Sequence, residues 1–269
     1  MAAPAGDSAS GQDGGIELWV APLDLAALEN RLGGHLLSPE ERERAEHLRF
    51  ESDRAHFIAG RLWLRLVLAQ RLGIDPSEVR LRARPGGKPE LAAPLPSWLR
   101  FSMSRSGSVG LYALADAGEI GVDLEERSGV IDAAAVASRF FSPAERAALA
   151  GLDEEERRRA FYRIWARKEA ALKALGAGLD APLGALDVAG DVASWDRAHP
   201  GAPTDPRNWF LHDIEVAPGY AAALATEAVL PRGVPAVGDA RQLLGGLLGG
   251  KLGGQSSGGV PNRARSSAR

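Results

Sequence analysis

The sequence predicts an α+β fold built from two similar lobes. Two observations support this prediction. Strand patterns alternate with helix patterns along the chain, and the same order of patterns occurs twice at a constant offset of 104 residues. With 269 residues, 45% of them hydrophobic, the chain can bury a core in one large domain or in two small ones. A cleft between two lobes is a natural place for a ligand.

The repeat starts at the first expected strand. Ile16 of IELWVAPLD and Ile120 of IGVDLEERS are 104 residues apart, and so are Ser38 and Ser142, which each begin a Ser-Pro-x-Glu sequence. This sequence is a helix-capping box with proline in the first turn, so two unrelated helices could share it by convergence. A constant offset over about sixty residues instead favours duplication.

Each half of the chain is expected to contain one strand, a capped helix and a longer helix, followed by further strands. The strands show alternating or continuous apolar residues, and the helices follow their capping boxes. The expected elements are, in chain order, a strand in 16–24, helices from 38, strands in 101–115, a strand in 120–128, helices from 142 and strands in 209–226.

These elements divide into an N-terminal lobe at 15–118 and a C-terminal lobe at 119–231. Residues 1–14 and 232–269 are rich in glycine and other small residues, which predicts disorder at both ends. We therefore expect the folded part of the chain to end near residue 231.

The composition excludes several classes of protein. The chain has no cysteine, which excludes disulfides, zinc–thiolate sites and thiol nucleophiles. A net charge of −3 argues against a general nucleic-acid binder. No apolar run approaches the roughly 20 residues that span a bilayer, and the first residues lack the apolar core of a signal peptide. We expect a cytoplasmic protein that acts neither on nucleic acid nor on membranes.

The stretch GVDLE at 121–125 places two carboxylates at the end of an apolar strand. Side chains alternate along a strand, so Asp123 and Glu125 share one face while Val122 and Leu124 point into the core. Two like charges on one face repel each other unless a cation or a shared proton lies between them. Oxygen ligands of this kind suit Mg²⁺, although a solvated strand end is the more common explanation of an isolated Asp-x-Glu.

The helix expected in 164–176 carries a second pair of charges. Trp165, Glu169 and Lys173 are spaced four residues apart and form one stripe of this helix. A Glu followed by a Lys at i+4 is also an ordinary surface salt bridge, worth about 0.3–0.5 kcal/mol. The tryptophan in the stripe indicates a face that meets protein rather than open water. A half-buried Glu and Lys need partners, which a metal and a phosphate would provide.

Five motifs, taken in order, resemble the signature of the 4′-phosphopantetheinyl transferases. They are GGKPEL (86–91), FSMSRSG (101–107), GVDLE (121–125), FFSPAER (140–146) and the W-x-x-K-E-A-x-x-K pattern (165–173). The resemblance covers about 15–230, and the duplicated halves are similar to the long members of the family, typified by the enzyme that activates surfactin synthetase. It implies an intramolecular pseudodimer with the active site in the cleft between the lobes.

The resemblance also implies a reaction. Members of the family transfer phosphopantetheine from coenzyme A to a serine of an acyl or peptidyl carrier protein, which converts the apo carrier to the holo form and releases 3′,5′-ADP. The implied class is the holo-[acyl-carrier-protein] synthase type (EC 2.7.8.7 class), acting as a monomer with Mg²⁺ or Mn²⁺. The alternative is a catalytically impaired module of the same fold that only binds carrier proteins or coenzyme A.

By the family's pattern, Asp123, Glu125 and Glu169 hold the metal, and Asp123, Glu169 and Lys173 are catalytic. Glu169 or a metal-bound water is the candidate base for the serine hydroxyl, and Lys173 meets the phosphate. Lys168 lies on another face of the helix, which indicates a structural or nucleotide-proximal role. The residues expected to bind coenzyme A are Lys88, Pro89, Ser104, Arg105, Ser106, Lys173, Arg54 and Arg61.

The first half and position 105 depart from the pattern. At the offset of 104, Asp123 corresponds to Trp19 and Glu169 to Arg65, so we expect one metal site rather than two. Where the family has His in Ser-His-Ser-Gly, expected near the 3′-phosphate of coenzyme A, this chain has Arg105. An arginine is always charged and can hold a phosphate through two hydrogen bonds. The change predicts preserved activity with an altered coenzyme preference, or else a crippled site.

Overall fold

The computed structural model describes residues 15–32, 36–84, 86–128, 132–177, 181–203 and 207–244. It confirms the expected α+β class. In the first half the elements are β1 (Ile16–Pro22), α1 (Leu25–Leu32), α2 (Pro39–Glu46), α3 (Glu51–Leu72), β2 (Leu81–Ala83), β3 (Pro89–Leu91), β4 (Arg100–Ser106) and β5 (Val109–Ala115). In the second half they are β6 (Ile120–Glu126), α4 (Ala133–Phe140), α5 (Pro143–Leu149), α6 (Glu154–Leu175), β7 (Leu186–Asp187), β8 (Val192–Trp195), β9 (Trp209–Asp213), β10 (Tyr220–Thr226) and β11 (Val237–Asp239).

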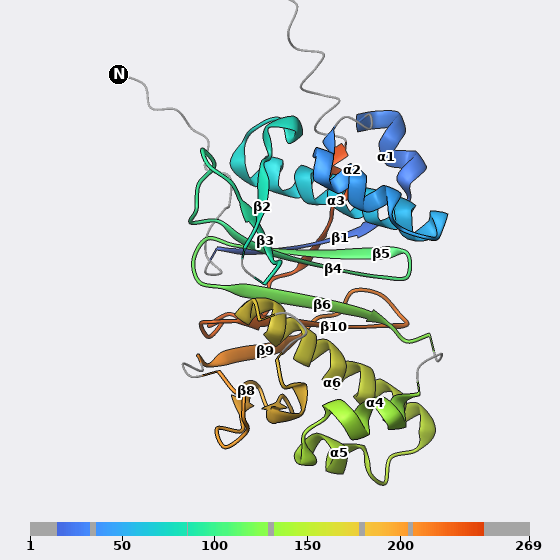
Figure 1. The fold of residues 1–269 in the computed structure, drawn as a ribbon, viewed down its shortest axis with the longest axis vertical. Helices are drawn as coiled ribbons and strands as arrows, with labels where there is room; N and C mark the ends of the chain where they lie inside the picture. The colour runs from blue at the N-terminus through green and yellow to red at the C-terminus, as the bar shows by residue number, and fades with distance from the viewer. Residues whose placement is uncertain are drawn as a thin grey trace, which may run out of the picture.

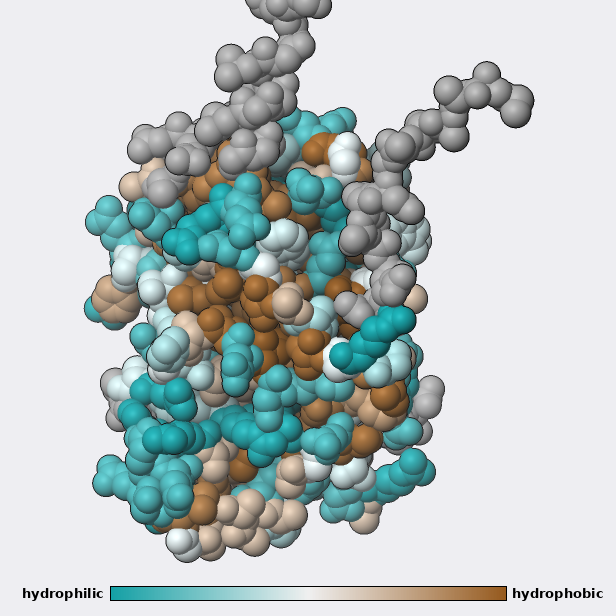
Figure 2. Space-filling model, turned by 180° about the vertical axis from the view of Figure 1, so that it is seen from behind, coloured by the Kyte–Doolittle hydropathy of each residue, from teal (hydrophilic) through white to brown (hydrophobic). Residues whose placement is uncertain are grey.

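Two sheets share one plan. In the first, β1 pairs with β5 and β5 with β4; in the second, β6 pairs with β10 and β10 with β9, all antiparallel. The sheets meet in the middle of the molecule, with α1, α2 and α3 beyond the first sheet and α4, α5 and α6 beyond the second (Figure 1). Apolar residues gather at this level on the opposite face of the molecule (Figure 2).

Three clusters of buried apolar side chains hold these layers together. One lies between α3 and the first sheet and contains Trp63, and a second lies between α6 and the second sheet and contains Phe161. The third joins the two sheets directly, with Leu18 and Leu111 from the first sheet and Val122 and Leu124 from the second. Val122 and Leu124 therefore point into the core, as the alternation in GVDLE predicts.

The two capping boxes form as predicted. The Ser38 hydroxyl accepts a hydrogen bond from the Glu41 backbone N–H at 3.2 Å, and the Ser142 hydroxyl accepts one from Glu145 at 3.1 Å. Each box starts a short helix that precedes a helix of 22 residues, α3 or α6. Both long helices end at a glycine with positive φ, Gly73 or Gly176, because a side chain disfavours that conformation.

The expectation that the fold ends near residue 231 is wrong. Strand β11 pairs in parallel with β1, with Val237 opposite Leu18. Ala240 is fully buried, and Leu244 is 7% exposed in the core around α3. The glycine-rich composition of the tail hides this short apolar segment, which is ordered because β1 offers it a free edge. Residues 1–14 and 245–269 lie outside the described residues.

Removing the chain after residue 231 should therefore destabilise the protein. The truncation exposes the edge of β1 and removes Ala240 and Leu244 from the core, which should lower the free energy of unfolding by about 2–5 kcal/mol. Urea denaturation measures the loss. The matched control is truncation after Leu244, which should unfold at the wild-type urea concentration. Equal midpoints for the two truncated proteins would show that residues 232–244 add no stability.

Within the six described segments, no helix combines the length and the apolar character that crossing a membrane requires.

Candidate active site

A cavity of about 440 Å³ opens between the two halves of the chain. The first half contributes Lys88, which precedes β3, and Pro89, the first residue of β3, and the second half contributes Glu169 and Lys173 of α6. A second cavity, of about 260 Å³, shares Lys173 with the first. Both cavities are also lined by Arg44 and Met103, so they adjoin each other.

The closeness of α6 to β6 depends on Gly121. A Cβ atom at this position would overlap the backbone of α6 at the Ala170 carbonyl oxygen and the Ala174 amide nitrogen. The glycine lets the helix backbone approach the strand backbone, so Asp123, two residues further along β6, comes within hydrogen-bonding distance of Lys173 on α6. The strand motif and the helix motif predicted from the sequence therefore meet at one place.

Asp123 is the most enclosed of the predicted carboxylates, at 3% exposure. Its Oδ1 atom accepts hydrogen bonds from the Lys173 ammonium at 2.5 Å and from the Ser104 hydroxyl at 2.8 Å. The Lys173 ammonium also donates to the Ser104 hydroxyl, at 2.8 Å. The other carboxylate oxygen, Oδ2, is buried and has no hydrogen-bond partner among the described residues.

Glu125 and Glu169 flank Asp123. The Trp165 indole donates to Glu125 Oε1 at 3.1 Å, and the Ser106 hydroxyl donates to Glu125 Oε2 at 3.4 Å. Burial and then the charge of Asp123 raise the pKa of Glu125 to about 7. The same two causes raise the pKa of Glu169, whose Oε1 atom is buried without a hydrogen-bond partner in the described part of the chain.

The carboxylate oxygens of Asp123, Glu125 and Glu169 are suitable ligands for a divalent cation. In the residues that the structure describes, no three acidic or histidine side chains already surround one point that could hold a metal. The buried oxygens of Asp123 and Glu169 nevertheless lack hydrogen-bond partners among the described residues, and the carboxylates raise the pKa of their neighbours. A cation that takes oxygen ligands would satisfy both the unpaired oxygens and the repulsion.

Three arginines surround the ring of Phe57 in the second cavity. The guanidinium carbons of Arg44, Arg61 and Arg105 lie 5.6, 5.4 and 5.6 Å from the ring centroid. Burial lowers the pKa of Arg61 and of Arg105, and neighbouring arginines act in the same direction. The Glu41 carboxylate lies 3.5 Å from Arg61 Nε, so it neutralises only part of the positive charge of the three arginines. The cluster suits a phosphate dianion.

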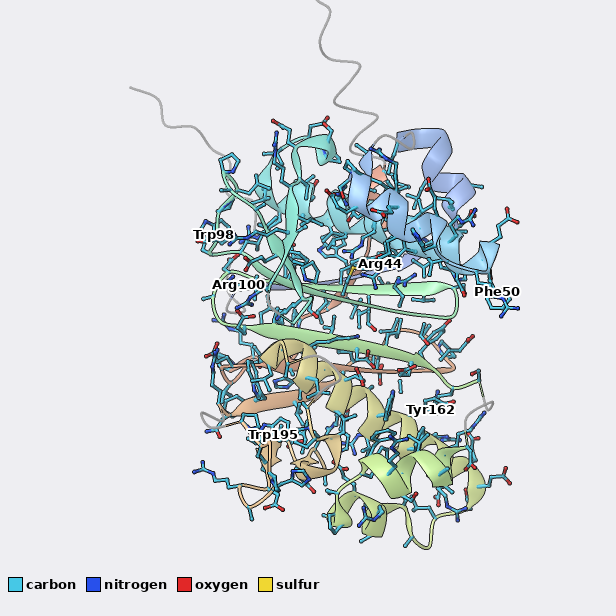
Figure 3. All side chains as sticks on the ribbon, in the orientation of Figure 1. Arg44, Phe50, Trp98, Arg100, Tyr162 and Trp195 are labelled. Atoms are coloured by element: carbon cyan, nitrogen blue, oxygen red, sulfur yellow. The ribbon has the colours of Figure 1, made fainter. Side chains whose placement is uncertain are left out.

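Arg44 and Phe57 were not predicted from the sequence. Figure 3 shows Arg44 at the level between the upper helices and the strands of the first sheet. Its position near the end of α2 shows no pattern that distinguishes it from Arg42, the other arginine of that helix. Only the packing of α2 and α3 on the sheet brings Arg44, Phe57 and Arg105 together.

Arg54, which was predicted to bind coenzyme A, and Arg65, the counterpart of Glu169, both make structural contacts. Arg54 lines neither cavity, and its guanidinium donates to the Ala45 and Leu48 carbonyls, which joins α2 to α3. Arg65 is buried and pairs with Glu41 at 2.7 Å.

The ammonium groups of Lys88 and Lys168 are paired with groups of the protein itself. Lys88 donates to Glu119 at 2.9 Å and to the Ile120 carbonyl at 3.0 Å, so its side chain ties the GGKPEL loop to β6. Lys168 is fully buried and pairs with the fully buried Glu145 at 2.8 Å. The structural role expected for Lys168 is confirmed. Lys88 lines the larger cavity, but its ammonium is already paired with Glu119.

Comparison with protein families matches both halves of the chain. The model of the 4′-phosphopantetheinyl transferase superfamily matches residues 119–225, and the model described as 4′-phosphopantetheinyl transferase, N-terminal, matches residues 29–116. The 4′-phosphopantetheinyl transferase HetI of Nostoc sp. is 36% identical over 175 residues, which is 65% of this chain and 73% of HetI. The 4′-phosphopantetheinyl transferase Sfp of Bacillus subtilis is 29% identical over 206 residues, 74% of this chain and 86% of Sfp.

The two matched regions meet at the boundary between the two sheets, and they contain Arg44, Arg105, Asp123, Glu169 and Lys173. The family resemblance inferred from five short motifs thus extends along most of the described chain. The protein belongs to the 4′-phosphopantetheinyl transferase superfamily, as a member of the long type that Sfp represents.

Proposed function

We propose that the protein transfers 4′-phosphopantetheine from coenzyme A to a serine hydroxyl of an acyl or peptidyl carrier protein, producing the holo carrier and 3′,5′-ADP. One observation carries this proposal. Asp123 of β6 pairs with the Lys173 ammonium of α6, and Lys173 and Glu169 line a cavity that adjoins a cluster of three arginines. Such a pair of cavities offers one place for a pyrophosphate and another for a separate phosphate.

In this proposal the two lobes form an intramolecular pseudodimer, and the cleft between them is the active site. The shared plan of the two sheets supports the first statement. The second is supported by the lining of the larger cavity, where Lys88 and Pro89 face Glu169 and Lys173.

The side chains then have distinct roles. The serine oxygen attacks the phosphorus that carries pantetheine, the bond to the other phosphate of the pyrophosphate breaks, and 3′,5′-ADP leaves. Glu169 accepts the serine proton, because a carboxylate with a raised pKa is a better base than an exposed one. Lys173 stabilises the charge that develops on the leaving group. Ser104 and Asp123 hold the Lys173 ammonium in place.

Asp123, Glu125 and Glu169 would hold the metal of this site. Mg²⁺, or Mn²⁺ in its place, supplies charge neutralisation for the pyrophosphate and Lewis-acid assistance when bound. The unpaired buried oxygens of Asp123 and Glu169 support this assignment. Trp165 and Ser106 orient Glu125 within the same group.

The test is incubation of the full-length protein with coenzyme A, Mg²⁺ and a panel of apo carrier proteins, followed by intact mass measurement of each carrier. We expect a mass increase of one phosphopantetheine on at least one carrier, and none when the metal is removed with a chelator. If no carrier gains mass although a known transferase modifies all of them, the impaired binding module is the correct function. The EC class, the cytoplasmic location and the monomeric state stay predictions.

The arginine cluster predicts a preference between two coenzymes. If Arg105 contacts the 3′-phosphate, Arg105→Ala should raise the KM for coenzyme A roughly tenfold to a hundredfold, because a charge-assisted hydrogen bond contributes about 1.5–3 kcal/mol. The KM for dephospho-coenzyme A, which lacks this phosphate, should change much less. Steady-state kinetics with both coenzymes measures the difference.

The matched control for this prediction is Arg54→Ala, which removes an arginine that lines neither cavity. Its KM values should stay near those of the wild type. A parallel rise for both coenzymes in Arg105→Ala would exclude a contact between Arg105 and the 3′-phosphate.

A further inference from the structure

Gly60 lies in the buried face of α3, directly against the side chain of Arg105 on β4. A Cβ atom at Gly60 would lie 2.7 Å from Arg105 Cδ, which is closer than side chains approach each other, and 3.5 Å from Met103 Cε, which is ordinary contact. The arginine stem therefore occupies the space that a side chain at position 60 would fill.

A glycine in the middle of a helix is unfavourable compared with an alanine, because it loses more backbone freedom on folding. Near Gly60, Arg105 is the one side chain that an added Cβ would crowd, and Met103 and the rest of its described surroundings would tolerate an alanine. Glycine at position 60 therefore destabilises the helix, but it leaves room for the Arg105 side chain.

The cross-strand neighbour of Arg105 is also a glycine, Gly110 on β5. A Cβ at Gly110 would lie 2.6 Å from the hydroxyl of Tyr112, and this hydroxyl donates a hydrogen bond to the Gly60 carbonyl at 3.2 Å. The bond from Tyr112 holds α3 at a set distance from the sheet, so the stem of Arg105 lies in a fixed gap.

The gap ends at the arginine cluster. Beyond its Cδ atom, the Arg105 guanidinium lies over the Phe57 ring beside Arg44 and Arg61, in the lining of the smaller cavity. We propose that Gly60 is a positioning residue for this anion site: its missing side chain lets the Arg105 stem lie against α3, and thereby sets the preference of the enzyme for a coenzyme that carries the 3′-phosphate. This inference rests on the proposed function.

The first experiment measures coenzyme preference in Gly60→Ala. The added methyl group should displace the Arg105 guanidinium and raise the KM for coenzyme A about threefold to tenfold, with kcat at saturating coenzyme within about twofold of the wild type. The KM for dephospho-coenzyme A should not change. In an Arg105→Ala background the same substitution should change neither KM, because the displaced side chain is gone.

The second experiment uses thermal unfolding of the same four proteins and needs no catalysis. Alanine is the better helix former, so Gly60→Ala should raise the melting temperature in the Arg105→Ala background, where nothing crowds the new methyl group. In the wild-type background the rise should be smaller or absent. The double variant also provides a folded protein if Gly60→Ala alone does not fold.

The results separate this inference from the proposed function. Equal effects of Gly60→Ala in the two backgrounds, in KM or in melting temperature, would overturn the link between Gly60 and Arg105, and so would failure of the double variant to fold. A parallel rise in KM for both coenzymes would also overturn it. If the wild type transfers nothing, the proposed function fails, and the melting temperatures still test whether Gly60 makes room for Arg105.

Discussion

Replacement of Asp123 by asparagine should lower kcat/KM for carrier modification by about a thousandfold or more, with the protein still folded. Asp123 Oδ1 accepts hydrogen bonds from both Lys173 and Ser104, and its buried Oδ2 has no hydrogen-bond partner in the segments that the structure describes. An amide keeps the shape of the side chain but removes the negative charge that neutralises Lys173 and would bind a metal. Glu125→Gln and Glu169→Gln should lose activity for the same reason.

Glu126→Gln is the matched control for these variants. Glu126 lies on the same strand as Asp123, but its side chain is exposed whereas that of Asp123 is buried. Its activity should stay near that of the wild type, and circular dichroism should show that all four variants are folded. Near-normal turnover of Asp123→Asn would remove Asp123 from the catalytic group.

Replacement of Lys168 by methionine should lower the free energy of unfolding by about 3–5 kcal/mol, because it leaves the charge of Glu145 buried without its partner. Both side chains of this pair are completely buried, and the Lys168 ammonium also donates to the Leu183 and Leu186 carbonyls. Urea denaturation measures the loss, and transfer activity should fall only in proportion to the fraction unfolded.

Lys173→Met is the matched control, because it removes the other lysine of the same helix. Lys173 is 31% exposed and contacts Asp123. We expect this variant to keep most of its stability and to lose transfer activity. If Lys168→Met is as stable as Lys173→Met, the buried pair with Glu145 does not hold α6 in place.

The carboxylates of the proposed active site could be predicted because their arrangement follows from local geometry. Alternation along β6 places Asp123 and Glu125 on one face, and the helical period of α6 places Trp165, Glu169 and Lys173 on another. Each pattern needs only the residue spacing and the element type. The capping boxes at Ser38 and Ser142 are local in the same sense, because three consecutive peptide units form them.

The residues missed or misjudged depend on contacts between distant parts of the chain. Arg44 and Phe57 reach Arg105 only because α2 and α3 pack on the first sheet. The segment with Ala240 and Leu244 is ordered only because β1 has a free edge, which its own composition does not reveal.

The sequence by itself predicted the α+β class and the carboxylates of the proposed active site from periodicity, and the family from the resemblance of five motifs. The tertiary structure decided which lysine is buried with Glu145 and which meets Asp123, although both lie on one helix five residues apart. It also decided which arginines gather around Phe57 and that the fold continues past residue 231. The physical reason is that burial and pairing depend on the distance between secondary-structure elements. At Gly121 and Gly60 the lack of a side chain allows neighbouring elements to lie close together.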